Sequence, residues 1–287
     1  MNKSRATASF VSALCIYGTI GWALAYISLP SEVVVACRGG IGTVFILIVL
    51  MVTRGRFDWQ AVRTDFPWLA AGGISLGLNW VLLFAAFRAT TVAVASLCNY
   101  MAPVILILVA PFVLGERRSL KKAACALVAV FGMILVSGVI EGGAEGVTPE
   151  GVGLGLGAAA FAATLVLSNK KLGAVPVFER SIVQLAFATL AALPFVIANN
   201  AGQTLTVDAL SIGLVLLLGV VHTGVAYCLY FGGLAGLSAQ TAAVLGYVEP
   251  AVAVIVSTLV LGEPLSLTGW IGAAIIIGAA ALSEVIE

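Results

Sequence analysis

Long apolar stretches follow one another along almost the whole chain, and short polar breaks separate them. A helix needs about 20 apolar residues to cross the hydrocarbon core of a bilayer. The hydropathy pattern contains ten stretches of roughly that length, at residues 9–29, 32–53, 66–87, 92–114, 119–140, 151–169, 177–198, 208–232, 237–261 and 266–284. The pattern therefore predicts an all-α polytopic membrane protein with ten transmembrane helices and short loops.

The first apolar stretch also has features of a secretory signal. Lys3 and Arg5 precede it, and Ala23-Leu24-Ala25 is similar to a cleavage site. The stretch from 10 to 29 is longer than the apolar region of a typical signal. We therefore expect it to remain in the protein as the first helix.

Composition narrows the class of protein further. The 287-residue chain is 61% hydrophobic and 9% charged, with a mean hydropathy of +1.15, whereas a soluble domain is about 45–50% apolar and about 25% charged. These values exclude a soluble enzyme, a nucleic-acid-binding protein and a disordered chain. The five cysteines lie in apolar stretches without the spacing of a metal site. We predict neither a metal nor another cofactor.

Basic residues are distributed unevenly between the loops. In the ten-helix arrangement, alternate connections hold twelve of the fourteen: Lys3, Arg5, Arg54, Arg56, Arg63, Arg117, Arg118, Lys121, Lys122, Lys170, Lys171 and Arg180. The opposite loops hold one base, Arg88, together with Glu32, Glu141, Glu145, Glu150, Asp208 and Glu263. Positive residues are enriched on the cytoplasmic side of a membrane. We therefore predict a multi-pass protein of a bacterial-type inner membrane with both termini in the cytoplasm.

The chain contains an internal repeat. Adding 147 to positions 69–138 gives 216–285 without a gap, which places Pro103 on Pro250 and Leu114-Gly115-Glu116 on Leu261-Gly262-Glu263. This repeat predicts two five-helix halves, 1–142 and 148–287. Because five is odd, the second half enters the membrane from the opposite side, as in the inverted repeats of many secondary transporters.

These markers resemble the drug/metabolite transporter superfamily, EamA type. Each half has a proline-containing helix, a Leu-Gly-Glu turn and a glycine-dotted last helix, with Pro103 in the first half and Pro250 in the second. Arg38 resembles the arginine of the family's second helix. Within the superfamily, the chain is most similar to the aromatic amino-acid exporter (YddG-like) branch. The resemblance implies ten helices around a central cavity and the export of amphipathic metabolites from the cytoplasm.

Three ionisable residues lie at membrane depth, where such side chains are costly and are functional candidates. Glu249 lies near the middle of the ninth helix, just before Pro250, and is either a proton or ammonium site or a paired structural carboxylate. His222 lies in the eighth helix and is either a proton relay or a satisfied core residue. Arg38 lies six residues into the second helix; it pairs with Glu32, extends to the outer surface or meets a substrate carboxylate.

Polar and aromatic residues recur on the repeated helices. Asn79-Trp80 corresponds to Ala226-Tyr227, and Asn99-Tyr100 corresponds to Gly246-Tyr247. Tyr230 shares a helix face with Tyr227. Rings with polar tips at intermediate depth suit a cavity wall, although ordinary helix packing is the alternative. The predicted substrate-binding residues are Glu249, His222, Asn79, Trp80, Asn99, Tyr100, Tyr227, Tyr230, Tyr247 and Arg38.

One motif is similar to a nucleotide-binding fingerprint. The residues Gly153-Leu154-Gly155-Leu156-Gly157-Ala158 match G-x-G-x-x-G/A, but that fingerprint requires a preceding strand in a βαβ unit. Glycines four residues apart on a membrane helix instead form a ridge that lets another helix approach closely. The sequence contains no HExxH or GxSxG motif, so we predict a protein that is not an enzyme.

These features predict a secondary transporter that exports small amphipathic metabolites, including amino acids with aromatic or apolar side chains, by alternating access. Glu249 and His222 would make it a proton antiporter, whereas downhill export needs no coupling residue. Alternatives are a multidrug or quaternary-cation efflux transporter, a metabolite uptake permease, a channel and a receptor-like membrane protein. The expected partners are a small-molecule substrate and the lipid bilayer, with no nucleic acid and no required oligomer.

Overall fold

The computed structural model describes residues 3–53, 55–90, 92–117, 119–136, 140, 147–200, 207–261 and 266–285. Within these ranges the chain forms helices joined by turns and no strand, which confirms the predicted all-α class. Among the described residues, eight helical stretches are long and apolar enough to cross a membrane, and Leu267–Leu282 is a shorter apolar helix. The chain is therefore a polytopic membrane protein, and the total of ten spans stays a prediction.

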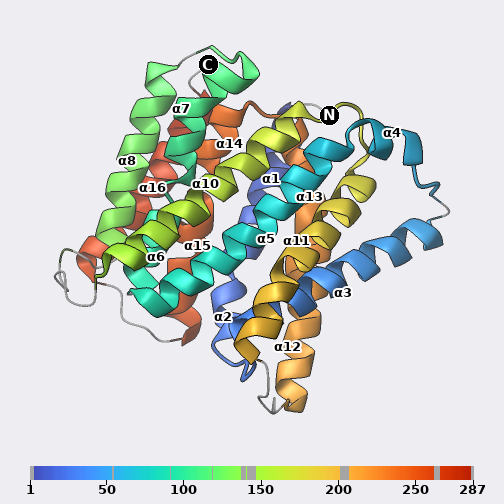
Figure 1. Ribbon diagram of the computed structural model, residues 1–287. Coiled ribbons are helices and arrows are strands. Elements are labelled where there is room, and N and C mark those ends of the chain that lie inside the picture. Colours follow the sequence, from blue (N-terminus) through green and yellow to red (C-terminus); the bar gives the residue numbers. More distant parts are fainter. Residues whose placement is uncertain are drawn as a thin grey trace.

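The helices before residue 140 follow the order of the first five predicted spans (Figure 1). They are α1 (Lys3–Gly18), α2 (Ile20–Leu24), α3 (Ser31–Val52), α4 (Trp59–Thr64), α5 (Phe66–Ala89), α6 (Val92–Asn99), α7 (Ala102–Leu114) and α8 (Leu120–Val136). α1 and α2 together form the first span, and α6 and α7 together form the fourth. α4 is a short helix between the spans formed by α3 and α5.

The helices after residue 147 follow the order of the last five predicted spans. They are α10 (Pro149–Lys171), α11 (Val177–Asn200), α12 (Ala209–Gly219), η1 (Val220–Val225), α13 (Ala226–Ala235), α14 (Ala239–Leu245), α15 (Val248–Val256), η2 (Ser257–Leu261) and α16 (Leu267–Val285). α12, the π-helix η1 and α13 are continuous and form one span. The next span contains α14, α15 and the π-helix η2.

Capping residues begin and end several of these helices at the polar breaks in the sequence. Thr148 and Asp208 cap α10 and α12 by accepting hydrogen bonds from the backbone amide three residues on, at 3.1 and 2.7 Å. Such caps satisfy first-turn amides that have no partner within the helix. α7 ends at Leu114 and is capped by Gly115, whose φ of 68° is the left-handed conformation favoured by glycine. Gly262 and Glu263 of the second predicted turn lie outside the described residues.

Two spans are broken at equivalent positions. α6 ends at Asn99 and α7 begins at Ala102, while α14 ends at Leu245 and α15 begins at Val248. These breaks are 146 residues apart, within one residue of the 147-residue repeat shift, and they lie beside Pro103 and Pro250. Proline lacks the backbone hydrogen-bond donor of a continuous helix. Broken helices occur in many transporters at the substrate site, because their free backbone groups face a cavity there.

Helices of the two predicted halves pack against one another throughout the molecule. α10 packs on α5, α1 on α13, α11 on α3 and α16 on α8. Figure 1 shows α8 and α16 at one edge and α3 and α12 at the other. The repeat shift of 147 residues relates α1 to α10 and α5 to the span that contains α13, so the pair α5–α10 corresponds to the pair α13–α1. It also relates α3 to α11 and α8 to α16, so each of these two pairs corresponds to itself. The repeat itself stays a prediction.

Glycines allow several of these helices to approach closely. A Cβ atom added to Gly77 of α5 would lie 2.5 Å from the Ala188 carbonyl oxygen of α11, and one added to Gly155 of α10 would lie 2.7 Å from Cβ of Cys98 in α6. Nothing lies within 4 Å of a Cβ added to Gly153. The glycine-rich motif therefore packs against other helices of the same chain, most closely at Gly155 and not at Gly153.

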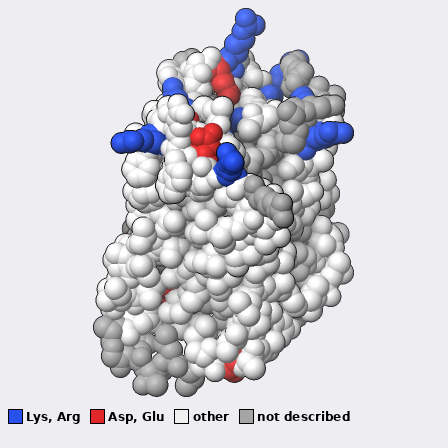
Figure 2. Space-filling view, turned by 90° about the vertical axis from the view of Figure 1, so that its right-hand side faces the viewer, with Lys and Arg blue, Asp and Glu red and all other residues white. Residues whose placement is uncertain are grey.

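Charged side chains gather at one end of the molecule. Figure 2 shows Lys and Arg crowded at the upper end with acidic residues among them, above a surface that is mostly uncharged. We call this end the basic face; α4 and both chain termini lie there (Figure 1). The end where α3 and α12 begin and α5 and α11 finish is called the opposite face. The predicted loop residues Arg54, Arg118, Glu141, Glu145 and Glu263 lie outside the described residues.

Candidate substrate cavity

A cavity of about 490 Å³, here called the central cavity, lies among helices of both predicted halves. Its wall includes α1, α2, α3, α5, α6, α7, α10, α13, α14 and α15. The lining is mainly apolar and aromatic, and its charged and amide side chains are Arg38, Asn79, Asn99 and Glu249. A volume of roughly 300–1,000 Å³ with a few polar groups in an apolar wall is typical of a small-molecule site.

Aromatic residues from three helices form one wall of the central cavity. On α13, Tyr227 and Tyr230 have ring centroids 6.1 Å apart. Tyr17 of α1 lies 5.2 Å from Tyr227 and 6.0 Å from Tyr230. Phe10 extends the group at 4.8 Å from Tyr230, and Trp80 of α5 lies 6.2 Å from Tyr227. Tilted and edge contacts of this kind are favourable for aromatic rings, and the wall offers ring surface to a flat apolar ligand.

Arg38 is a buried cation beside this wall. Its guanidinium carbon lies 4.4 Å from the centroid of the Trp80 ring, and the residue is 6% exposed. Contact with a ring face stabilises a cation without neutralising it, and Nε of Arg38 has no hydrogen-bond partner among the described residues. Glu32 forms an ion pair with Arg88, so the described structure does not contain the pairing of Arg38 with Glu32 that the sequence allowed. The guanidinium is therefore suited to bind a carboxylate.

Glu249 lies where the second broken span resumes. It belongs to the first turn of α15, and its backbone amide donates to the carbonyl of Gly246 at 3.3 Å. Arg38 and Glu249 are both described and both line the central cavity, and no ion pair within 4.0 Å joins them. The cavity thus presents a guanidinium and a carboxylate that are not paired with each other.

An amide pair joins α5 to α6 at the other break. Asn79 donates from Nδ2 to Oδ1 of Asn99 at 2.9 Å and to the carbonyl of Ala158 in α10 at 2.8 Å. Both hydrogens of the Asn79 amide are therefore used within the protein. Asn99 and its neighbour Tyr100 line the central cavity. Of this amide pair, Asn99 is the member whose hydrogens are suited to bind a ligand.

Two of the ten predicted site residues lie away from the cavity lining. His222 belongs to η1, and its Nε2 lies 2.8 Å from Oγ1 of Thr19 at the joint between α1 and α2. Because Thr19 Oγ1 donates to the carbonyl of Ile16, Nε2 of His222 is the donor in this contact. Tyr247 is fully buried in the break between α14 and α15. We leave both residues out of the site proposed below; the other eight line the cavity.

The contribution of α1 to the lining was not predicted. Phe10, Leu14 and Tyr17 all line the central cavity, and their spacing of four and three residues places them on one helix face. Tyr17 is an aromatic residue with a polar tip inside a predicted span. The same criterion that selected Tyr227 and Tyr230 could have selected it.

Three charged side chains hold the turn between α13 and α14 at the basic face. Lys170 of α10 donates to the backbone carbonyls of Leu234, near the end of α13, and Leu237, in the turn that follows. Lys122 of α8 donates to the hydroxyl of Thr241 at 2.7 Å. Glu116, which follows α7, accepts a hydrogen bond from the first backbone amide of α14 at 2.8 Å. We call these contacts the latch, because they join the α13–α14 turn to three other helices between the central cavity and the basic face.

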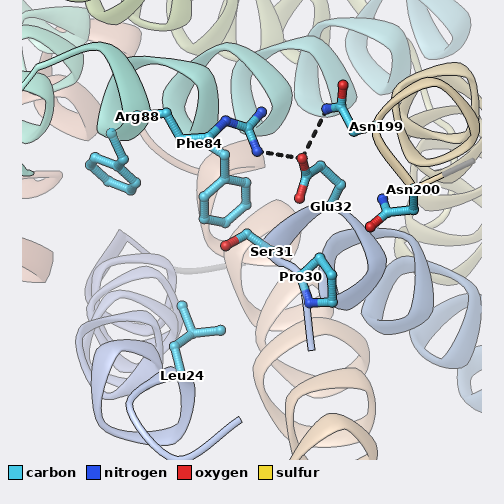
Figure 3. A pocket seen from close by; sticks show the side chains of 9 residues that line it. Leu24, Pro30, Ser31, Glu32, Phe84, Arg88, Asn199 and Asn200 are labelled. Carbon is cyan, nitrogen blue, oxygen red and sulfur yellow. Dashed lines mark hydrogen bonds and ion pairs between the residues drawn. The ribbon is translucent and has the colours of Figure 1, made fainter. Parts of the chain in front are cut away.

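A second hollow of about 520 Å³, here called the vestibule, adjoins the central cavity toward the opposite face. Leu24, Phe84 and Phe87 line both spaces. Figure 3 shows the vestibule, with the polar side chains of Glu32, Arg88 and Asn199 meeting at one side. The vestibule thus lies next to the central cavity on the side of the opposite face, while the latch holds the basic face.

Comparison with known proteins identifies the family. The profile of the EamA-like transporter family matches residues 6–138 and, separately, residues 150–284. The chain belongs to the EamA-like transporter family. This membership confirms the superfamily that the sequence markers predicted, and it makes the protein a membrane transporter; EamA-family transporters are not enzymes.

Two similar proteins are also named as transporters. The chain is 26% identical over 286 residues to the uncharacterised transporter YxxF of Bacillus subtilis (strain 168), covering 99% of this chain and 90% of that one. It is 30% identical over 202 residues to an uncharacterised transporter of Archaeoglobus fulgidus, covering 67% of each chain. A solved crystal structure with 21% sequence identity covers 98% of both chains with a TM-score of 0.84, which shows a shared fold.

Proposed function

We propose that this EamA-family transporter exports α-amino acids with aromatic or other apolar side chains from the cytoplasm across an inner membrane. The observation that carries the proposal is the central cavity, in which an aromatic wall faces a guanidinium and a carboxylate that are not paired with each other. Each part of such an amino acid has a counterpart there. Tyr227 and Tyr230 would contact the ring, Arg38 the carboxylate and Glu249 the ammonium group, and Asn99 would add a hydrogen bond.

The proposed orientation follows from the charges. Basic residues are enriched on the cytoplasmic side of membrane proteins, so we place the basic face, with both termini, in the cytoplasm. The central cavity then communicates with the outer side through the vestibule, and the latch closes the cytoplasmic side. We propose that two inverted halves, 1–142 and 148–287, alternate between this arrangement and one in which the latch is open. The choice of export over uptake comes from the resemblance to aromatic amino-acid exporters.

Flux of labelled L-phenylalanine into proteoliposomes tests the proposal. Unlabelled amino acids and methyl viologen serve as competitors, with and without a pH gradient. We expect saturable, stereoselective flux that aromatic amino acids inhibit. Glu249→Gln should lose this flux, because the ammonium group loses its counter-charge, while Glu150→Gln at the exposed start of α10 should keep it. Absence of saturable amino-acid flux by correctly folded protein overturns the proposal.

The pH gradient distinguishes two roles of Glu249. Gradient-driven flux that is lost in Glu249→Gln supports a carboxylate that exchanges protons during transport. Flux that is indifferent to the gradient and is still lost in Glu249→Gln supports an ammonium anchor in a facilitated exporter.

Efflux of quaternary cations is the second candidate, because a carboxylate among aromatic rings is also suited to bind such ions. Arg38 in the same wall argues against it, since its charge repels a cation that lacks a carboxylate. Saturable flux of methyl viologen without flux of phenylalanine would favour this candidate.

A further inference from the structure

We propose that the vestibule contains a second binding site, which takes the zwitterionic head group of an amino acid as it passes between the central cavity and the outer solution. This inference rests on the proposed function, because the same amino acid would occupy both sites in turn.

The site is built around one ion pair. Nη1 of Arg88 donates to Oε1 of Glu32, and the same oxygen accepts a hydrogen bond from Nδ2 of Asn199 at 2.9 Å. The side chain of Glu32 is 6% exposed, whereas that of Arg88 is 56% exposed. Figure 3 shows these side chains, from three different helices, converging beside Ser31 at the vestibule. The carboxylate is therefore held in place, while much of the arginine remains accessible to a ligand.

A purely structural clamp is the simpler interpretation of this ion pair. Glu32 in the first turn of α3 and Arg88 in the last turn of α5 both suit the helix dipoles. A clamp, however, requires neither a half-exposed arginine nor a hollow of about 520 Å³ beside it. Arg88 also lies on the side predicted to be external, where basic residues are depleted. We infer that the exposed part of Arg88 binds a ligand.

A second contact on the same two helices leads from this ion pair to the central cavity. Arg38 of α3 lies against Trp80 of α5, and Glu32 of α3 pairs with Arg88 of α5. Glu32 and Arg38 are six residues apart, which corresponds to about 9 Å along the helix. Two guanidinium groups therefore lie in succession along the route from the central cavity to the opposite face, and a carboxylate that leaves Arg38 would next meet Arg88.

The two charges of the pair determine which ligand fits. A simple anion would be attracted by Arg88 and repelled by Glu32, and a simple cation would experience the reverse. A zwitterion satisfies both groups, with its carboxylate on Arg88 and its ammonium group on Glu32. The vestibule should therefore prefer an α-amino acid to an analogue that lacks either charge.

Protection of an engineered cysteine tests this preference. Ser31→Cys places a thiol on the exposed wall of the vestibule, in full-length protein whose five native cysteines are replaced by alanine. The rate at which a membrane-impermeant maleimide, applied from the outer side, labels this thiol is measured with and without each probe. The probes are L-phenylalanine, phenethylamine without the carboxylate, and phenylacetate without the ammonium group. We expect L-phenylalanine to protect at a concentration about tenfold lower than either analogue, because it makes one more charge-assisted contact.

Variants that remove one charge should then change which probes protect the cysteine. Arg88→Gln should abolish protection by phenylacetate and keep protection by phenethylamine, and Glu32→Gln should do the opposite. Arg38→Gln, which alters only the central cavity, should keep protection by L-phenylalanine in the vestibule. Arg63→Gln, at an exposed position near the basic face, is the control for a lost arginine charge.

The outcomes separate this site from the transport proposal. The same protection pattern in wild type and Arg88→Gln, or no protection by L-phenylalanine while its flux is intact, overturns the vestibule site. Protection that changes as expected, without saturable amino-acid flux, overturns the proposed function and leaves the vestibule site standing. Because Glu32 is nearly buried, the result for Glu32→Gln is interpreted only if that variant purifies as folded protein. Arg88→Gln, at a half-exposed position, is sufficient by itself to test the vestibule site.

Discussion

At the scale of single residues, the proposed specificity depends on how Arg38 and Glu249 are kept apart. A buried ion pair between them would occupy both groups, so a ligand would have to compete with the pair for either charge. Arg38 is instead held against the ring of Trp80 at 4.4 Å, and Glu249 lies beyond the break between α14 and α15. The central cavity thus contains two opposite charges that are not paired with each other, which is what the proposed binding of a zwitterion requires.

Replacing Arg38 tests its assignment as the carboxylate contact. Arg38→Gln should lower kcat/KM for L-phenylalanine by about 10- to 100-fold, because a charge-assisted hydrogen bond contributes roughly 1.5–3 kcal/mol. Arg38→Lys should recover part of this loss, since it restores the charge without the planar fork. Flux of phenethylamine, which has no carboxylate, should not fall. An equal loss for both compounds in a proteoliposome assay would show that Arg38 supports the structure and does not bind the carboxylate.

At the scale of elements, the two broken spans bring helix ends to the central cavity. Asn99 and Tyr100 lie at one break, and Gly246 lies at the other, with Glu249 in the following turn; all four line the cavity. Free amides and carbonyls at such ends can bind polar groups that a continuous helix would exclude. The two breaks therefore place polar groups from both predicted halves around one cavity.

Helix packing at the glycine-rich motif can be tested with a matched pair of variants. Gly155→Leu should destabilise the protein by about 1–3 kcal/mol, because even a Cβ atom there would lie 2.7 Å from Cβ of Cys98. Gly153→Leu should have little effect, since nothing lies within 4 Å of its added Cβ. Thermal unfolding of the purified protein in detergent measures both. Equal destabilisation of the two variants would contradict a packing role specific to Gly155.

The N-cap of α12 predicts a pH-dependent contribution to stability. The backbone amide of Ser211 and the hydroxyls of Ser28 and Ser211 donate to the Asp208 carboxylate and lower its pKa. A lowered pKa in the folded state means that the stabilisation is present above the unfolded pKa of about 3.9 and is lost as pH falls through the folded value. Asp208→Ala should therefore lower Tm at pH 7.

The pH series provides the control for this prediction. The difference in Tm between wild type and Asp208→Ala should shrink as pH falls below about 4. Asp208→Asn keeps an acceptor for the cap and should lose less stability at pH 7 than Asp208→Ala. A Tm difference for Asp208→Ala that is the same at all pH values would show that the ionised carboxylate is not responsible.

At the scale of the whole molecule, the two ends of the central cavity are built differently. The latch at the basic face uses Lys122, Lys170 and Glu116, each bonded to the α13–α14 turn or to α14. The repeat shift places Lys122 on Gly269 and Lys170 on Ala23, so the two lysine contacts have no lysine counterpart at the other end. The latch should therefore favour the arrangement seen here, in which the cavity meets the vestibule.

Weakening the latch should shift the protein toward opening at the basic face. Lys170→Gln removes a charged donor to two carbonyls, and charge-assisted bonds of this kind alter a two-state equilibrium about tenfold or more. A cysteine at cavity-lining Leu14, in a background without native cysteines, should then react faster with a maleimide applied from the basic face. Lys171→Gln, at the exposed neighbouring position, is the matched control. Equal labelling of both variants would argue against a gating role of Lys170.

Much of the fold was predictable, because hydropathy and helix signals act locally. Backbone polar groups in lipid must be satisfied within their own helix, so apolar stretches of about 20 residues indicated the helices. Pro103 and Pro250 lie beside the two breaks, but proline alone did not predict them, because Pro194 lies inside the continuous helix α11. The site was less predictable, as His222 illustrates. The sequence suggested one continuous helix there, but η1 is π-helical and has a different number of residues per turn, and His222 contacts Thr19 and not the cavity.

Hydropathy, repeat spacing and paired motifs in the chain were enough to establish an all-helical membrane protein and to indicate its transporter family. Each of these signals depends on residues near one another in sequence or on a periodic comparison. Packing established the rest: the wall shared by Tyr17, Tyr227 and Trp80, the separation of Arg38 from Glu249, and the vestibule beyond them. These features depend on the rotation of each helix and on close approaches between distant segments, which side-chain volumes determine only when the whole molecule is assembled.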